Sequence, residues 1–277
     1  MSAARIKAVN CFRRLIGAKA PKPAVGMGKR LFAIGDIHGR QDLLDALVKR
    51  MGRHIASAPP ADNILVFLGD YIDRGPASRA VIERLCGLER ETGWRCVFLK
   101  GNHDQAVLEF LQDPSYYSAW RGYGAAETLL SYGVMPPRFE NASDFARAWD
   151  GFARKIPPHH LEFLGGLKYF HVEDDYLFVH AGIRPGIALA DQTPEDMMWI
   201  RENFLSYRGR FEKMVVHGHT PAPAPVTLSN RICIDTGAHA TGRLTALVLE
   251  GENQSFLDVR NKTPLHEVMQ GFQAVNS

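Results

Sequence analysis

The sequence predicts an α/β fold in one compact domain. Two observations predict the fold class: short apolar runs of strand length alternate with amphipathic helical segments, and successive strands end about 30 residues apart, the length of a βαβ unit. A third observation concerns position: segments rich in Asp, Asn and His follow several of the strands. Because parallel strands end at one edge of a sheet, these polar segments should share the edge where α/β proteins bind ligands.

The first part of the chain contains three predicted strands separated by two predicted helices. The strands are residues 30–35, 64–68 and 95–99, and the helices are residues 41–56 and 78–92. In the first helix Leu43, Leu47 and Met51 recur at the spacing that places apolar side chains on one helical face. The strand–helix alternation predicts that the three strands lie parallel.

The second part of the chain changes from helices to strands. Residues 105–165 are predicted to be mostly helical, either as a cap over the ligand edge or as an ordinary packing layer. Residues 167–172 and 176–179 are predicted to form a hairpin around an acidic turn. Further strands are predicted at residues 213–216, 225–228, 231–234 and 243–250.

The charge of the chain divides it into an arm, a domain and a tail. Net charge is +3, yet eight Lys and Arg residues precede the first acid, Asp36. We therefore predict a flexible basic arm at 1–29, a catalytic domain at 30–256 with a helical insertion at 105–165, and a tail at 257–277. The arm is interpreted as a solvated tail. A transit peptide, or weak contact with membrane or nucleic acid, is the alternative interpretation.

Composition restricts the compartment and the class of protein. The four cysteines form no C-x-x-C pair, which favours free thiols in a reducing compartment. No apolar run reaches the roughly 20 residues that span a bilayer. We expect a cytoplasmic protein with no stable nucleic-acid or membrane partner.

Five segments carry the side chains that bind divalent metals. They are residues 35–39, 69–75, 101–104, 180–182 and 217–220. Two cations about 3.5–4 Å apart can hold both the attacking and the leaving oxygen of a phosphoryl group. Asp36 and His38 are predicted to bind one ion, and Asp70 to bridge the two. Neutral ligands are expected from Asn102, His180 and either His217 or His219, which lie on the same side of their strand.

Other polar residues suit roles beside the metals. Arg74 presents a planar fork for phosphate oxygens, and Arg201 is a second candidate for this role. His103 is placed to act as a general acid. Asp73 or Asp104 could hold its imidazole and raise its pKa.

Simpler structural roles compete with each of these assignments. Asp36 and Asp70 could cap helices, and Asn102 could be a turn residue. His180 taken alone could be a core histidine, and Arg201 could be an ordinary surface residue. Asp235 is interpreted as a turn residue, and His239 as a residue that either contacts the site or ends a strand.

The ordered motifs resemble the bacterial-type phosphoprotein phosphatase family of calcineurin-like metallophosphoesterases. The family pattern GDxHG, GDxxDRG, GNHE, a later His and a last His matches Gly35–Gly39, Gly69–Gly75, Gly101–Asp104, His180 and His219. The bacterial W-I-R and G-H-T motifs are matched at Trp199–Arg201 and Gly218–Thr220. The resemblance covers residues 30–251 and implies two packed mixed β-sheets flanked by helices. We expect this fold to carry the helical residues 105–165 as a cap-like insertion.

The resemblance also implies the roles of individual residues. One metal would be held by Asp36, His38 and Asp70, and the other by Asp70, Asn102, His180 and His219. A metal-bridging hydroxide would attack phosphorus directly, with Arg74 and Arg201 on the phosphate, His103 as general acid and Asp73 orienting it. Two divalent ions are implied, with Mn²⁺ the usual choice and Fe or Zn as alternatives.

The sequence is compatible with more than one class of substrate. We expect a protein serine/threonine phosphatase acting on phosphoproteins or phosphopeptides. Asp104 replaces the Glu that is usual in the family and resembles the diadenosine tetraphosphatase relatives, so a dinucleoside polyphosphate hydrolase is the alternative. Those relatives typically lack an acid at the position of Asp73. This chain has the acid, which favours a phosphomonoester substrate. A non-catalytic binding module is the third hypothesis, but the ligand set has no gaps.

Overall fold

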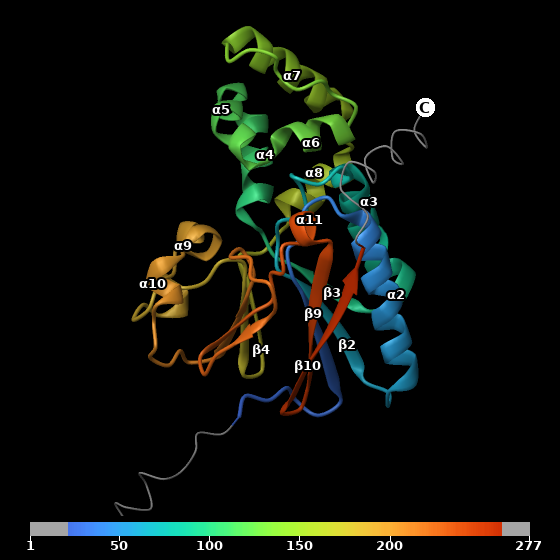
Figure 1. Cartoon of the computed structure of the whole chain (residues 1–277), viewed down its shortest axis with the longest axis vertical. Coiled ribbons are helices and arrows are strands. Elements are labelled where there is room, and N and C mark those ends of the chain that lie inside the picture. Colours follow the sequence, from blue (N-terminus) through green and yellow to red (C-terminus); the bar gives the residue numbers. More distant parts are fainter. Residues whose placement is uncertain (1–21, 262–277) are drawn as a thin grey trace, which may run out of the picture.

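The computed structural model describes residues 22–261, which form two stacked five-stranded sheets with helices on their outer faces (Figure 1). The first sheet has the order β10-β9-β1-β2-β3 and contains β1 (Lys29–Ile34), β2 (Asp62–Phe67), β3 (Arg95–Phe98), β9 (Arg243–Glu250) and β10 (Asn253–Arg260). The second has the order β4-β5-β6-β8-β7 and contains β4 (Phe170–Glu173), β5 (Tyr176–Val179), β6 (Met214–His217), β7 (Val226–Thr227) and β8 (Arg231–Cys233). Both sheets are mixed, which confirms the predicted α/β architecture.

Strand pairing confirms the parallel arrangement that the spacing predicted. β1 pairs parallel with β2, and β2 pairs parallel with β3. β5 and β6 are also parallel neighbours in the second sheet, and β4 and β5 form the predicted hairpin. The carboxyl ends of β1, β2 and β3 therefore meet at one edge, and the loops that follow β5 and β6 approach the same region.

Alternate side chains of β1 enter two different cores because successive residues of a strand face opposite sides. Leu31 and Ala33 are buried between the two sheets. Phe32 faces the opposite way and packs with apolar residues of α2 (Gln41–Ser57) and α3 (Ser78–Thr92). The sheets are thus joined by one core and covered on the outside by another.

The second sheet has its own cover on its outer face. Val179 and Val215 of this sheet pack with Phe204, which lies in the short helix α10 (Glu202–Leu205). Helix α9 (Pro194–Trp199) precedes it and ends beside the metal-binding loops. This placement brings Trp199 and Arg201 close to the candidate site.

Residues 102–165 form a helical body at the top of Figure 1. It contains α4 (Asn102–Gln112), α5 (Tyr117–Trp120), α6 (Ala125–Ser131), α7 (Ala142–Lys155) and α8 (Pro158–Gly165). Phe110, Trp120 and Phe152 are fully buried and pack together, and they belong to the same core as α2 and α3. Most of these aromatic residues therefore build a packing layer, while Tyr123 is half-buried and reaches the site.

The two predicted domain boundaries fall inside packed structure. Val25, placed in the predicted arm 1–29, is buried between the sheets, and its N–H donates to Gly251 O at 2.9 Å. At the other end β10 runs to Arg260, beyond the boundary predicted at 256, because Leu257 and Val259 pack against the helices. The rest of the arm and tail lies outside the described residues. Within residues 22–261 no helix has both the length and the apolar character that a bilayer crossing requires.

Candidate metal centre

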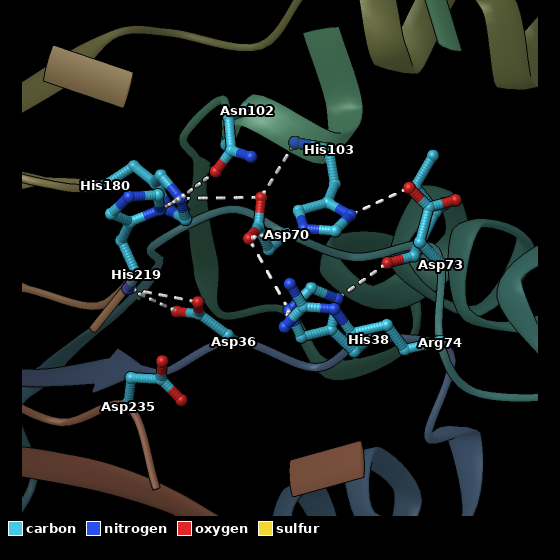
Figure 2. A network of polar contacts seen from close by, with 12 residues as sticks. Asp36, His38, Asp70, Asp73, Arg74, Asn102, His103, His180, His219 and Asp235 are labelled. Carbon is cyan, nitrogen blue, oxygen red and sulfur yellow. Dashed lines mark hydrogen bonds and ion pairs between the residues drawn. The ribbon is translucent and has the colours of Figure 1, made fainter. Parts of the chain in front are cut away.

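The loops after five strands bring the six predicted metal ligands together in one buried cluster (Figure 2). The ligands are Asp36 and His38 after β1, Asp70 after β2, Asn102 after β3, His180 after β5 and His219 after β6. Each side chain is at most 6% exposed. Residues that are far apart in the sequence thus share one small volume, as the strand-end argument predicted.

Asp70 lies in the middle of this cluster and faces histidines on both sides. Its Oδ2 is 3.5 Å from His38 Nε2, and its Oδ1 is 3.5 Å from His180 Nε2. Two groups of ligand atoms, each within 4.8 Å, share Asp70: one adds His38 and His103, and the other adds His180 and His219. Asp70 is therefore the residue that could bridge two ions.

The remaining predicted ligands extend one side of the cluster. His180 Nε2 lies 3.1 Å from Asn102 Oδ1 and 3.2 Å from His219 Nδ1. Asp36 lies next to this group, where its Oδ2 accepts a hydrogen bond from His219 N at 3.1 Å. The side-chain oxygen of Asn102 and ring nitrogens of His180 and His219 therefore lie close together, as expected for ligands of one ion.

Two of the imidazoles are oriented by backbone carbonyl groups. His38 Nδ1 lies 2.9 Å from Ile72 O, and His180 Nδ1 lies 2.9 Å from Leu68 O. Donation from Nδ1 leaves the Nε2 lone pair facing the cluster, which is the usual arrangement of a metal-binding histidine. Burial lowers the pKa of both side chains, so each is neutral and able to coordinate.

Three buried acids, Asp36, Asp70 and Asp235, lie close together in and beside the cluster. Burial, followed by the neighbouring charges of Asp235 and Asp70, raises the pKa of Asp36 well above its usual value. Burial also raises the pKa of Asp235 to about 6. Burial opposes ionisation of Asp70 as well, but the histidines around it outweigh burial and lower its pKa. Carboxylates and neutral imidazoles gathered away from water fit divalent cations, which would offset this crowding.

His103 and Asp73 form a hydrogen-bonded pair beside the ligands. His103 Nδ1 lies 2.8 Å from Asp73 Oδ2, and His103 Nε2 faces the cluster at 3.8 Å from Asp70 Oδ2. The fully buried Asp73 also accepts hydrogen bonds from Trp120 Nε1 at 2.8 Å and Thr128 Oγ1 at 2.6 Å. Burial alone would lower the pKa of His103, but Asp70 and Asp73 outweigh it and raise that pKa. His103 is thus oriented and favoured in its protonated form.

Of the two acids considered as partners of His103, Asp73 contacts its imidazole and Asp104 does not. The Asp104 carboxylate accepts from the backbone N–H groups of Asp70 at 2.8 Å, Gly101 at 2.9 Å and Tyr71 at 3.1 Å. Asp104 thereby fastens the loop after β2 to the start of α4. Burial and the Asp70 charge raise the pKa of Asp104 to about 8. Because Asp104 is fully buried, its replacement of Glu does not by itself select a substrate.

The candidate phosphate-binding arginines approach from two sides. Arg74 Nη1 lies 3.2 Å from His38 Nε2. Arg201 is exposed at the start of α10, and its charge adds to burial and to His180 in lowering the pKa of His219 to about 2.

The structure separates His217 from His219, which the sequence pattern alone could not do. His219 lies beside His180, with its ring centroid 5.0 Å from that of His180. His217 packs edge-on against Phe204 at 4.9 Å, in the core of the second sheet. His219 has a φ of 62°, and this left-handed backbone separates its direction from that of His217.

Unusual backbone geometry is concentrated in the cluster. Of the six non-glycine residues with positive φ in the described part of the chain, three are candidate ligands (His38, Asp70 and His219) and two lie beside the ligands (Asp73 and Arg74). Such conformations cost on the order of 1–3 kcal/mol each and persist where the surrounding structure enforces them. The left-handed backbone turns these loops so that their side chains face the cluster.

Four residues that adjoin the cluster were not assigned a role in the site from the sequence, although His239 was considered as a possible contact and Trp199 was part of a matched motif. Asp235 is buried near Asp36, and the ring of His239, in the short helix α11 (Ala238–Thr241), lies 5.0 Å from that of His38. Tyr123 stacks edge-on against His103 at 5.5 Å, and Trp199 lies 6.2 Å from His219. Asp235 and His239 follow β8 in an Asp-Thr-Gly-Ala-His segment, the same type of strand-end pattern that located the other ligands.

The known proteins that this chain resembles in sequence and in structure include phosphoesterases and tetraphosphatases. The family described as calcineurin-like phosphoesterase matches residues 29–248. A bis(5′-nucleosyl)-tetraphosphatase PrpE (asymmetrical) from Bacillus thuringiensis strain Al Hakam is 29% identical over 228 residues, which cover 77% of this chain and 88% of the relative. A protein of the same name from Geobacillus thermodenitrificans is 29% identical with the same coverage. Among solved structures, a proposed diadenosine tetraphosphatase has a TM-score of 0.56 at 20% identity and covers 87% of this chain and 100% of its own.

Proposed function

The chain belongs to the calcineurin-like phosphoesterase family of hydrolases, and on that basis we propose that it cleaves dinucleoside polyphosphates at a dinuclear metal centre. This substrate replaces the phosphoprotein that the sequence analysis favoured. The curated relatives named above support it, since they are called bis(5′-nucleosyl)-tetraphosphatases. Diadenosine tetraphosphate is the reference substrate of the proposal.

The aromatic pair Tyr123 and Trp199 is the observation that carries the proposal. Their ring centroids are 5.5 Å apart, Tyr123 adjoins His103, and Trp199 adjoins His219. The pair therefore spans both halves of the cluster, and both side chains are half-buried, which leaves ring surface accessible. Bases stack on such rings with about 1–3 kcal/mol each. A phosphoserine or phosphothreonine side chain offers no ring to use this surface.

Six residues would hold the two ions: Asp36, His38, Asp70, Asn102, His180 and His219. When bound, divalent ions there would supply Lewis-acid chemistry toward the phosphate and activate water. The donor set of oxygen and imidazole nitrogen suits Mn²⁺, Fe²⁺ and Zn²⁺, and we propose Mn²⁺ as the activating ion.

The remaining roles belong to side chains that contact substrate. Arg74 and Arg201 bind phosphate oxygens from opposite sides of the cluster. His103 donates a proton to the leaving oxygen from Nε2, while Asp73 holds Nδ1 and fixes the tautomer. Trp120 and Thr128 act through Asp73, because they saturate its carboxylate and keep it aimed at His103.

Phosphomonoester hydrolysis is the second candidate, and the Asp73–His103 pair favours it. A serine or threonine alkoxide is a far poorer leaving group than a nucleotide phosphate, so it depends more on a proton donor. The pair would supply an imidazole that is oriented by Asp73 and favoured in its protonated form. The two candidates therefore differ in how much each needs His103.

A direct substrate comparison tests the proposal. We expect kcat/KM for diadenosine tetraphosphate to exceed that for a phosphoserine peptide, with a nucleoside triphosphate and a nucleoside monophosphate as the unequal products. The Trp199→Ala variant should raise KM for the dinucleotide about 5- to 100-fold, which corresponds to the loss of one stacked base. The same variant should leave the KM for the phosphoserine peptide nearly unchanged, because phosphoserine has no ring to stack on Trp199. A higher kcat/KM for the phosphopeptide, or equal effects of Trp199→Ala on both substrates, would overturn the assignment.

A further inference from the structure

A second cluster of metal-ligating side chains lies between α3 and α8 and shares no residue with the centre described above. Glu83 of α3 and His159 and His160 of α8 place a carboxylate oxygen and two ring nitrogens within 4.8 Å of one another. Glu83 and His159 are exposed, whereas His160 is fully buried. The cluster thus has one fixed member and two that solvent can reach.

The distances within the cluster suit a small ion. Glu83 Oε2 lies 3.0 Å from His159 Nε2 and 2.9 Å from His160 Nε2. Tetrahedral Zn²⁺ with ligands at about 2.0–2.2 Å places neighbouring ligand atoms roughly 3.3–3.6 Å apart. Glu83 Oε2 would need to move away from the two ring nitrogens by only a few tenths of an ångström, and the exposed Glu83 side chain can make that adjustment.

His160 is held in the orientation that a ligand requires. Its Nδ1 lies 2.8 Å from the hydroxyl oxygen of Tyr132, which is also buried. Without an ion, Nε2 donates to Glu83 and the Tyr132 hydroxyl donates to Nδ1. With an ion bound, the hydroxyl can accept from Nδ1 instead, which would free the Nε2 lone pair for the ion and is the type of outer contact that orients histidines at metal sites. Burial lowers the pKa of His160, so the neutral form is favoured.

Space for a further ligand lies directly beside the cluster. Glu83 and His159 line an open surface cavity of about 550 Å³. Water, or a small ligand, can therefore reach a fourth coordination position. A site with two histidines, one carboxylate and an open position is a recognised zinc arrangement.

We propose that Glu83, His159 and His160 form a second metal site that binds a borderline divalent ion, with Zn²⁺ as the test ion. Two imidazole nitrogens and one carboxylate favour Zn²⁺ over Mg²⁺ or Ca²⁺, which prefer oxygen ligands. The ion links α3, which covers the first sheet, to α8, the last helix of the helical body. The site is independent of the substrate assigned to the metal centre.

Zinc counting on the untagged full chain tests the site. Wild type and a Glu83→Gln/His159→Gln variant are stripped with chelator, dialysed against Zn²⁺ and measured by elemental mass spectrometry. The variant should hold one ion per chain fewer than wild type. Glu89→Gln, which removes another exposed acid of α3, is the matched control and should hold as many as wild type. Equal zinc counts in wild type and the double variant would overturn the proposal.

A second measurement separates this site from the other centre. In an Asp36→Asn/Asp70→Asn background, bound Zn²⁺ should give an X-ray absorption spectrum with two imidazole ligands. Addition of Zn²⁺ should raise the thermal midpoint of this variant. Further substitution with Glu83→Gln and His159→Gln should abolish both effects, while His160 stays intact to preserve the buried contact with Tyr132. Persistence of the zinc-dependent midpoint shift after that substitution would contradict the site.

Discussion

Asp70 combines three roles within one residue. Its two carboxylate oxygens face different histidines, its backbone N–H is held by Asp104, and its φ of 53° turns the chain toward the cluster. A left-handed conformation in an aspartate is unfavourable and persists because neighbours enforce it. The side chain is therefore fixed before any ion arrives, and its replacement should change ion binding most directly.

Asp70→Asn and His103→Asn should fail in different ways. Asp70→Asn removes the charge that both halves of the cluster face, so metal content and activity should fall together. His103→Asn removes the proposed proton donor and should retain the ions, with kcat lowered on the order of 10²–10⁴ for a phosphomonoester. The loss should be smaller for diadenosine tetraphosphate, whose leaving group needs less protonation. Elemental analysis and kinetics on both variants measure these effects.

Thr128→Val and Trp120→Phe are the controls for this comparison, since each removes one hydrogen bond to the Asp73 carboxylate and leaves His103 in place. Thr128→Val also removes one acceptor of the Asp73 backbone N–H. They should lower kcat less than His103→Asn and shift its pH profile. Equal metal loss in Asp70→Asn and His103→Asn would refute the division of roles.

The gathering of the six candidate ligands could be predicted from the sequence because their chemistry is distinctive and each follows a strand. The buried acid Asp235 and the adjoining His239 were not assigned to the site, since Asp-Thr-Gly resembles a turn as much as a ligand loop. The choice between Asp73 and Asp104 as the partner of His103 also needed coordinates. It depends on backbone hydrogen bonds that occupy Asp104, which side-chain types do not reveal.

At the scale of elements, close backbone approach shapes the metal-binding loops. A Cβ atom at Gly218, between β6 and His219, would overlap Asp36 Oδ1, and one at Gly101, before α4, would overlap Asp70 Oδ1. These glycines are needed because a carboxylate occupies the space of a side chain. The loops from different strands thus fit together only with glycine at the contact.

Gly218→Ala should therefore displace Asp36 and weaken metal binding while the fold survives. We expect at least a tenfold lower affinity for the activating ion, measured by activity against metal concentration in chelator-buffered solution. Gly165→Ala, where a Cβ meets no atom within 4 Å, is the matched control and should behave as wild type. Unchanged metal affinity in Gly218→Ala would show that Asp36 is not confined as described.

A polar contact at the start of α2 predicts a pH effect on stability. Arg40 donates to both oxygens of Asp42 at 2.8 Å and 2.7 Å, and Asn261 donates to Asp42 at 2.8 Å. Burial opposes ionisation, but these hydrogen bonds outweigh it and lower the pKa of Asp42 in the folded chain. A lowered folded pKa adds stability above the unfolded pKa of about 3.9, and this is lost as the pH falls through the folded value.

Asp42→Asn should lower the free energy of unfolding at pH 7 by about 1 kcal/mol. The difference from wild type should shrink as the pH falls below about 4, because the wild-type carboxylate then becomes protonated. Urea unfolding at several pH values measures this, with Asp191→Asn, at an exposed acid, as control. A difference that stays constant through the acid range would contradict the role of the ionised carboxylate.

Buried strands were easier to predict from the sequence than exposed ones. Strands β1, β2 and β9 are apolar runs covered on both faces, so hydrophobicity alone locates them. β10 is an edge strand with mostly half-buried and exposed residues, and its pattern is too weak to predict. Val25 was assigned to the arm because a single apolar residue between Pro23 and Gly26 shows no helix or strand periodicity.

At the scale of the whole molecule, the metal centre lies where the two sheets meet. Asp36, Asp70 and Asn102 come from the first sheet, whereas His180 and His219 come from the second. Periodicity predicted the parallel strands of the first sheet, but the stacking of two sheets came only from the family resemblance. The inter-sheet core holds the two ligand sets together, so ion binding should also stabilise the fold.

Activity after chelation is the most direct test of the account. The full chain is treated with chelator until elemental analysis finds no bound divalent ion, and hydrolysis of diadenosine tetraphosphate is followed before and after Mn²⁺ is restored. We predict that hydrolysis falls to background without ions and returns when Mn²⁺ is added. Hydrolysis at the full rate by metal-free protein would contradict the central claim that this cluster acts through bound cations.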